Sequence, residues 1–212
     1  AEPLQALRDG IAFEEKITTL ASKVAEYAML RQSTDAKDPQ AGSQMGRIMG
    51  VLSQTAGPEA AFRGWAAKLP QLMELVRGDE QLKDYEFLFA NMADSSRYLL
   101  PGMGEEIAAK LRLSGGSAWK DLQGYLTSTV PVQYNGEVTN LSTIRNLAYD
   151  EDAAVRKEAY EAELACYRQI QDPVAYALNS IKLETIFDCQ LRGYPSPLDR
   201  TLAQSYMKRE TL

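Results

Sequence analysis

The fold is decided by Ser114–Tyr160, SGGSAWKDLQGYLTSTVPVQYNGEVTNLSTIRNLAYDEDAAVRKEAY. This stretch sets a Gly-Gly turn, a helix carrying Trp119, an Asn-Gly turn and a second, acid-capped helix in a fixed order. Asn135-Gly136 tolerates positive φ at both turn positions, so its surroundings predict a β-hairpin over residues 130–141. Three acidic residues, 150–152, precede the second helix and interact favourably with its dipole. The stretch therefore predicts helices joined by one small hairpin.

The rest of the chain carries helical patterns, because apolar residues recur along it at three- and four-residue spacing. Near the N-terminus this spacing predicts a helix over residues 3–33, which Gly10 kinks or splits, and a second helix over 39–53. The side chains expected on one face of the first helix are Leu4, Leu7, Ile11, Ile17, Leu20, Val24 and Tyr27, and those expected to point inward from the second are Met45, Ile48, Met49 and Leu52.

Further helices are predicted from the same spacing and from cap and break residues between the periodic segments. Ser117 and Ser142 are predicted N-caps, since a serine hydroxyl accepts hydrogen bonds from the free N–H groups of a first turn. Asp172-Pro173 is predicted to interrupt the last long helical pattern, because proline lacks the N–H that a helix interior uses. These helices are expected to begin near Gly57, Pro70, Leu82, Glu105, Ser117, Ser142, Asp150, Val174 and Leu198.

The fold class that follows is all-α, mainly helical, with one small β-hairpin near residues 130–141. A run of breaks between residues 101 and 116 divides the chain. We expect an N-terminal helical lobe over residues 1–100 and a hairpin-containing helical region over residues 101–212.

Composition excludes several classes of function. The 212 residues carry a net charge of -6 and show no basic stripe, which argues against nucleic acid as a partner. No apolar run approaches the roughly 20 residues that span a bilayer, and the N-terminus does not resemble a signal peptide, so no membrane association is expected. The chain does not begin with Met, so the true N-terminus is expected to be missing. Two ordinary reduced cysteines, Cys166 and Cys189, indicate a cytoplasmic protein.

The absence of histidine decides the chemistry that this chain can perform. A catalytic zinc site of the HExxH type needs two histidines one helical turn apart, so that both imidazoles project from one face. Ser-His-Asp and Cys-His catalysis need histidine as well. No catalytic or metal-binding residue is therefore expected in this chain.

Each of the weaker candidate sites can also be explained by a purely structural role. Ser114-Gly115-Gly116-Ser117 presents backbone N–H groups either to an anion or only to a helix cap. The pairs Glu14-Glu15 and Glu105-Glu106 are interpreted as solvated helix surface, because adjacent helical side chains do not face each other. The aromatic cluster near residue 89 is either core or a ligand pocket; its members are Tyr85, Phe87, Phe89 and Met92.

Four segments carry a resemblance to a known family when they are taken in order and spacing. They are Gly116-Ser117-Ala118-Trp119, Asn135-Gly136-Glu137, Ala154–Tyr160 and Arg192-Gly193-Tyr194-Pro195-Ser196. On the basis of these four segments, the chain resembles the oligoendopeptidase F family of M3-type zinc metallopeptidases, and the resemblance is clearest between Leu111 and Leu202. It looks like the amino-terminal, non-catalytic region, whose first hundred residues match by helical pattern only.

The resemblance implies a mostly helical enzyme with a deep cleft, in which HExxH and a downstream Glu bind zinc on the carboxy-terminal side. That portion would begin after Leu212, so zinc is expected in the full-length parent and not in this chain. The implied partners are the parent's own catalytic domain and short peptide substrates, for which this region would form a wall and cap of the cleft. Arg192 and Tyr194 are the candidate cleft-facing residues, and the alternative for Tyr194 is that its ring anchors the turn by packing.

Two functions are expected from these observations. The first is the cleft-wall and substrate-access region of an oligoendopeptidase F-like zinc metalloendopeptidase, catalytically inert by itself. The alternative is a standalone helical protein-interaction module without enzymatic activity. A helical ligand-binding protein is a third possibility, supported only by the aromatic cluster.

Overall fold

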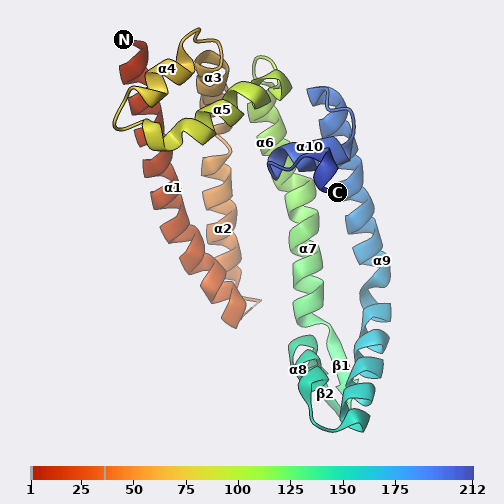
Figure 1. The fold of residues 1–212 in the computed structure, drawn as a ribbon. Helices are drawn as coiled ribbons and strands as arrows, with labels where there is room; N and C mark the ends of the chain where they lie inside the picture. The colour runs from red at the N-terminus through yellow and green to blue at the C-terminus, as the bar shows by residue number, and fades with distance from the viewer. Residues whose placement is uncertain (1, 36) are drawn as a thin grey trace. The chain divides into compact units, whose positions relative to one another are not determined.

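The computed structural model describes residues 2–35 and 37–212, and most of them are helical (Figure 1). The chain falls into two compact units. Unit 1 is built from the chain up to Thr34, from Asp38–Leu111 and from Thr185–Leu212, and unit 2 chiefly from Arg112–Glu184. The predicted fold class, mainly helical with one hairpin, is confirmed. The predicted division into folding domains at residues 100 and 101 stays a prediction.

Unit 1 contains helices from both ends of the chain. They are α1 (Pro3–Thr34), α2 (Pro39–Leu52), α3 (Ala56–Ala66), α4 (Leu72–Arg77), α5 (Glu86–Ser95), most of α6 (Gly104–Ser114), the last turns of α9 (Ala153–Arg192) and α10 (Pro197–Gln204). Unit 2 contains α7 (Gly116–Thr129), β1 (Pro131–Tyr134), β2 (Glu137–Asn140), α8 (Leu141–Asn146) and the larger part of α9. Short 3-10 turns lie at Lys83–Tyr85, Ser96–Tyr98, Leu147–Tyr149 and Arg209–Thr211.

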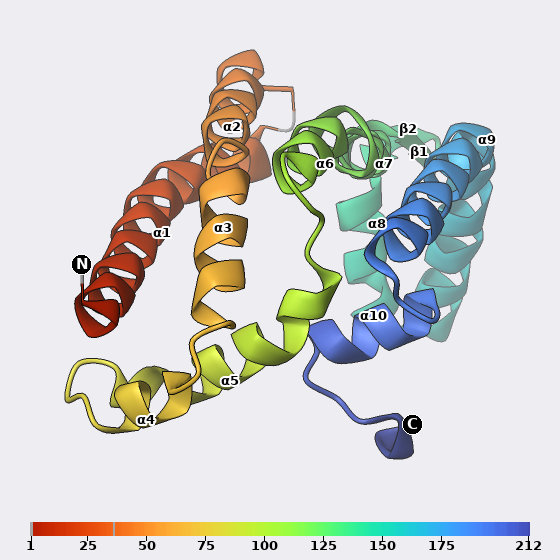
Figure 2. The ribbon, with the colours of Figure 1, turned by 90° about the horizontal axis from the view of Figure 1, so that it is seen from above.

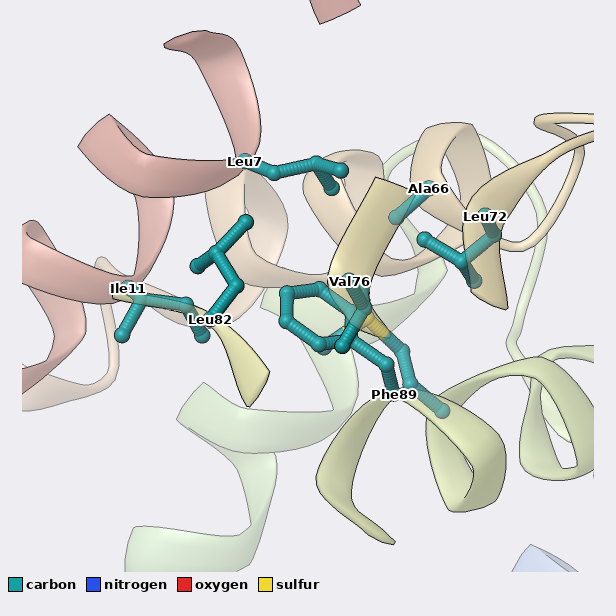
Figure 3. Packing of buried hydrophobic residues seen from close by; sticks show 8 residues of the cluster. Leu7, Ile11, Ala66, Leu72, Val76, Leu82 and Phe89 are labelled. Carbon is teal, nitrogen blue, oxygen red and sulfur yellow. The ribbon is translucent and has the colours of Figure 1, made fainter. Parts of the chain in front are cut away.

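The core of unit 1 joins the first turns of α1 to α3, α4 and α5. Phe89 is completely buried at its centre, and Figure 3 shows its ring beside Val76 and Leu82, with Leu7 turned toward the same space. The buried members are Leu7, Ile11, Ala66, Leu72, Val76, Leu82, Phe89 and Met92. Only the N-terminal turns of α1 reach this core, because its remaining turns bury no residue before Ala28.

The core of unit 2 lies between the hairpin, α8 and α9. The antiparallel register pairs Gln133 with Val138 and Tyr134 with Glu137, and both central residues of the turn between them have positive φ. The hairpin predicted over residues 130–141 is therefore confirmed. The buried members of this core are Val130, Val132, Leu141, Ile144, Ala159, Cys166 and Ile170.

Several sequence predictions about helix ends are wrong. Asp172-Pro173 does not interrupt a helix, because α9 runs without a break through Pro173. Proline removes one N–H donor, and the buried residues on either side of it, Ile170 and Ala177, hold both halves of the helix in place. Gly10 does not split α1 either; its missing side chain lets the ring of Phe62 pack directly on the helix backbone.

The two predicted serine caps are also wrong. Helix α7 begins at Gly116 with Gly115 as its N-cap, so Ser117 already lies in the first turn. Helix α8 is capped by Asn140, whose side-chain oxygen accepts a hydrogen bond from the Thr143 N–H at 3.0 Å. An asparagine side chain caps a first turn as well as serine does, and here Asn140 occupies the extended backbone conformation that a cap needs.

We expect Gly136→Ala to destabilise unit 2 by about 1 kcal/mol, because alanine is strained at positive φ. Gly136 has φ +80° at the hairpin turn. The matched control is Gly124→Ala in α7, where an added Cβ meets open space and a helical glycine is replaced by a better helix former. Urea unfolding followed by circular dichroism should give a lower midpoint for the first variant and a higher midpoint for the control. Equal midpoints would contradict the turn geometry.

Candidate functional site

Helix α9 ends in the turn that holds the two candidate cleft residues, Arg192 and Tyr194. Gly193 follows the helix with φ +76°, a left-handed conformation that glycine adopts without strain. The Tyr194 N–H donates to the Cys189 carbonyl at 2.9 Å and the Gly193 N–H donates to the Gln190 carbonyl at 3.3 Å. This is the Schellman pattern, which satisfies the last carbonyl groups of a helix. The backbone therefore fixes both candidate side chains in place.

The guanidinium of Arg192 is held on three sides within unit 1. It makes a two-pronged ion pair with the Glu105 carboxylate, at 2.6 and 2.9 Å, and its Nε donates to Asp188 at 2.8 Å. A third contact runs from Nη1 to the Tyr98 carbonyl at 3.1 Å. The hydrogen bond with Glu105 is the main cause of a raised Arg192 pKa, so this side chain stays charged at every accessible pH.

Asp188 links this ion pair to the last helix, because its second oxygen lies 2.9 Å from Nη2 of Arg200 in α10. Only 13% of the side-chain surface of Arg192 and 10% of that of Asp188 is exposed. Two arginines and two carboxylates thus form a largely desolvated cluster, which we call the Arg192 cluster and define as Arg192, Glu105, Asp188 and Arg200. Most of the hydrogen-bonding capacity of Arg192 is used inside this cluster.

The ring of Tyr194 stacks on that of Tyr98, with the ring centroids 3.8 Å apart and the planes at 16°. Burial raises the pKa of the Tyr194 hydroxyl, so the side chain stays neutral at physiological pH. This stacking is the packing role that the sequence analysis gives as the alternative to a cleft-facing role for Tyr194. Whether Arg192 and Tyr194 also face a substrate cleft stays a prediction.

The sequence did not anticipate an apolar groove between α1 and α2, which lie side by side (Figures 1 and 2). It has a volume of about 560 Å³. Its lining residues, which we call the α1–α2 groove, are Ile17, Leu20, Ala21, Val24, Tyr27, Gln44, Arg47, Ile48, Val51, Leu52 and Thr55. Hydrophobic periodicity marks such a stripe but does not tell whether the chain's own core covers it.

Large apolar side chains are exposed in this groove. Leu20 is 56% exposed, Val24 51%, Tyr27 57% and Val51 63%. The prediction that Met45, Ile48, Met49 and Leu52 point into a core is wrong, because the only buried residue of α2 is Ala41. A contiguous apolar stripe of this kind on a helical surface is typical of an interaction site.

A partly buried carboxylate lies where α1 passes α3. Glu14 has one carboxylate oxygen, Oε1, shielded from solvent and without a hydrogen-bond partner, and Arg63 Nε is in the same situation. Loss of solvent raises the pKa of Glu14, the Arg63 charge lowers it and the Glu59 charge raises it, with a net increase. This carboxyl group therefore favours its protonated form more in the folded than in the unfolded chain.

We expect Glu14→Gln to stabilise the chain at pH 7 by less than about 1 kcal/mol, since a partly solvated charge is screened. A raised pKa contributes stability below the unfolded value, near 4.3, and that contribution is lost as the pH rises through the folded value. The difference in unfolding free energy between the variant and the unsubstituted chain should therefore shrink as the pH falls from 7 toward 4. Thermal unfolding at several pH values measures this, and a variant less stable than the parent at pH 7 would contradict the sign.

The remaining candidates carry no chemistry of their own. No three carboxylate or thiol groups in residues 2–35 and 37–212 lie close enough together to hold a metal ion. The Gly116 N–H donates to the carboxylate of Glu184, so the chain itself supplies the anion at this helix start. In the aromatic cluster Phe89 and Met92 are core, whereas Phe87 is 63% exposed. Among the described helices, none combines the length and apolarity needed to cross a bilayer.

Comparison with known proteins supports the family resemblance. The family model for the N-terminal region of M3 peptidases, described as oligopeptidase F, matches residues 67–130. Curated proteins give no match. The fold is similar to the crystal structure of oligoendopeptidase-F from Enterococcus faecium, with a TM-score of 0.76 and 19% identity over 93% of this chain. It is also similar to a proposed peptidase from Chlamydophila abortus, with a TM-score of 0.59 and 18% identity over 94% of this chain.

The chain spans less than half of each of these structures, 41% of the first and 34% of the second. At this level of identity the two structures show a shared fold.

Proposed function

We propose that this chain is the substrate-access region of an oligoendopeptidase F-like peptidase. Residues 67–130 match the oligopeptidase F amino-terminal family model, and the fold is similar to that of oligoendopeptidase-F. In this role it forms a wall and cap of a cleft that admits short extended peptides and excludes folded proteins. The shared fold over 93% of the chain is the observation that carries the proposal. The chain is catalytically inert by itself.

Zinc does not fit the residues of this chain. It contains no histidine, and the described carboxylates and thiols form no group of three. We therefore place the metal of the parent enzyme, and every step that depends on it, outside this chain. Its partners are then the catalytic domain of the longer protein and short peptides. A cytoplasmic location agrees with the two cysteines, Cys166 and Cys189, which are buried and unbridged.

Arg192 and Tyr194 belong to the proposed cleft wall as positioning residues. The Schellman turn and the Arg192 cluster hold them rigidly at the end of α9. A rigid turn suits the wall of a cleft, because no binding free energy is lost in ordering the turn when a peptide enters. The guanidinium of Arg192 is engaged inside the chain, so we assign its contribution to the shape of the wall.

Photo-crosslinking in the longer protein that carries this chain tests the role. A peptide of about ten residues with a benzophenone side chain is irradiated with the protein, and the modified residues are mapped by mass spectrometry. We expect modified residues within this chain, competed by unlabelled short peptides and not by a folded protein that contains the same sequence. Modification confined to the rest of the longer protein would overturn the cleft-wall role.

A second candidate function, a helical interaction module, is favoured by one observation, the exposed apolar side chains of the α1–α2 groove. The intact mass of the source protein separates the two functions. A mass well above the 23.5 kDa of this chain supports the access region of a larger enzyme. A mass equal to it supports the interaction module.

A further inference from the structure

We propose that Asn135, at the tip of the hairpin, is a site of spontaneous covalent modification, in which its side-chain amide is converted to a carboxylate. The reaction is deamidation through a cyclic imide, and the folded turn controls its rate. This inference does not depend on the peptidase proposal, because it rests on the chemistry and the backbone of the hairpin alone.

The sequence singles out one asparagine for this reaction. The chain contains five, Asn91, Asn135, Asn140, Asn146 and Asn179, and only Asn135 is followed by glycine. The reaction requires the backbone nitrogen of the next residue to approach the asparagine side chain. A following residue with a Cβ hinders this approach, whereas glycine has no Cβ and allows a wide range of backbone angles. Asn135 is therefore the asparagine whose sequence favours the reaction most.

The structure points to the same residue. Three of the other asparagines lie in the helices α5, α8 and α9, where regular hydrogen bonds fix the backbone. The side chain of the fourth, Asn140, is engaged as the N-cap of α8. Asn135 and Gly136 are both exposed, and a Cβ built on Gly136 meets nothing within 4 Å. Water and hydroxide therefore reach the turn freely.

The reaction balances with water as the only co-reactant. The backbone nitrogen of Gly136 forms a bond to Cγ of Asn135, and the bond from Cγ to Nδ2 breaks. Nδ2 leaves as ammonia, with the Gly136 N–H supplying the third hydrogen in the net reaction. Water then adds to either carbonyl of the cyclic imide and opens the ring to aspartate or isoaspartate. Because hydroxide must first take up the Gly136 proton, the rate rises with pH.

The folded turn slows the attack. Asn135 has φ +51° and Gly136 has φ +80°, the combination of a type I′ turn. In this turn ψ of the first central residue is about +30°, which places the Gly136 nitrogen on the side of the Cα–C bond opposite to the Asn135 Cβ. Ring closure needs both atoms on the same side, and the rotation that brings them there separates Tyr134 from Glu137, the pair that closes the hairpin. The reaction therefore proceeds from the open turn.

Isoaspartate prevents the turn from closing in its original register. Its main chain passes through the former side chain and is one carbon longer, whereas the pairing of Tyr134 with Glu137 depends on a two-residue turn. Val132 in β1 is completely buried, and a change of register moves such a side chain away from the core. The separated isoaspartate form should therefore unfold at a lower urea concentration than the fresh chain, and an equal midpoint would contradict the loss of register.

Peptide mapping of the aged 212-residue chain tests the modification. The chain is incubated at neutral and at mildly alkaline pH and digested, and the peptide that contains Asn135 is followed by mass spectrometry. This peptide should gain the mass difference between aspartate and asparagine, before any peptide with another asparagine and faster at alkaline pH. A free peptide of residues 128–142 should react about tenfold faster or more, because the chain must first open its hairpin.

Two valines of the hairpin form a matched pair that tests the control by the turn. Val132→Ala removes a buried side chain and should raise the rate about fivefold or more, because the hairpin opens more often. Val138 is 66% exposed, so Val138→Ala should leave the rate within about twofold. Circular dichroism checks that both variants keep their helical content, and the comparison of the chain with the free peptide needs no substitution.

Three results would overturn the proposal. If Asn135 stays intact as long as the other asparagines do, it is not a modification site. Equal rates in the chain and in the free peptide would show that the folded turn does not control the reaction. Equal rates for the two valine variants would separate the reaction from the opening of the hairpin.

Discussion

Replacing Phe89 by alanine is expected to destabilise unit 1 by about 3–5 kcal/mol, the largest effect of any single substitution considered for this chain. Phe89 is completely buried and packs against side chains from α1, α3 and α4. Removing its ring deletes apolar contacts from all of these elements at once. The cavity that remains is bounded by helices that cannot all move inward to fill it.

The two tryptophans make this loss measurable by fluorescence. Trp65 lies in unit 1 and Trp119 in unit 2, and the chain contains no others. In a Trp119→Phe background, urea unfolding followed through Trp65 reports on unit 1. The control is Phe87→Ala on the same helix, whose side chain is 63% exposed and makes a T-shaped contact with the ring of Tyr206, at a centroid distance of 5.0 Å. It should cost about 1 kcal/mol. Similar losses for the two variants would show that Phe89 is not the centre of this core.

Replacing Arg192 by alanine is expected to destabilise unit 1 by about 3 kcal/mol, because breaking a largely buried ion pair leaves its carboxylates in a poorly solvated place. Glu105 loses both prongs of its bidentate partner, and Asp188 loses the Arg192 Nε–H donor while its ion pair with Arg200 remains. Arg192→Lys should recover part of the loss, since an ammonium keeps the charge but not the planar fork. Thermal and urea unfolding measure both variants.

The matched control for Arg192 is Arg77→Ala, which removes an arginine from an ion pair on the surface of the same unit. The Arg77 side chain is 63% exposed and its partner Glu86 is 44% exposed, so water replaces the pair readily. Its unfolding midpoint should stay close to that of the parent. An Arg192→Ala midpoint equally close to the parent would show that the Arg192 cluster does not hold the turn before α10.

Local chemistry made much of the fold predictable from the sequence. Asn135-Gly136 sets a turn through its own backbone preferences, and the structure has the hairpin there with positive φ at both residues. The spacing of Leu7 and Ile11 identified residues that are indeed core. Local rules failed where packing overrides them, as at Pro173, which buried residues on either side keep inside a continuous helix.

The candidate sites were less predictable, because they depend on partners far away in sequence. The turn motif indicates Arg192 and Tyr194, but their partners Glu105 and Tyr98 lie in another part of the chain, where no local pattern marks them. The apolar spacing of Ile17, Leu20, Val24 and Tyr27 predicts one helix face, and all four side chains line the α1–α2 groove. Its periodicity is the same for a face that the core covers and for a face that a partner covers, so its exposure could come only from the structure.

We propose that this chain shares the fold of the amino-terminal part of a peptidase and performs no peptide hydrolysis by itself. The most direct test is hydrolysis of a fluorogenic peptide of about ten residues by the purified 212-residue chain in the presence of zinc. We predict no rate above that of buffer with zinc alone, since the chain has no histidine and no described group of three metal ligands. A rate that rises in proportion to the chain concentration and disappears with a chelator would contradict this account.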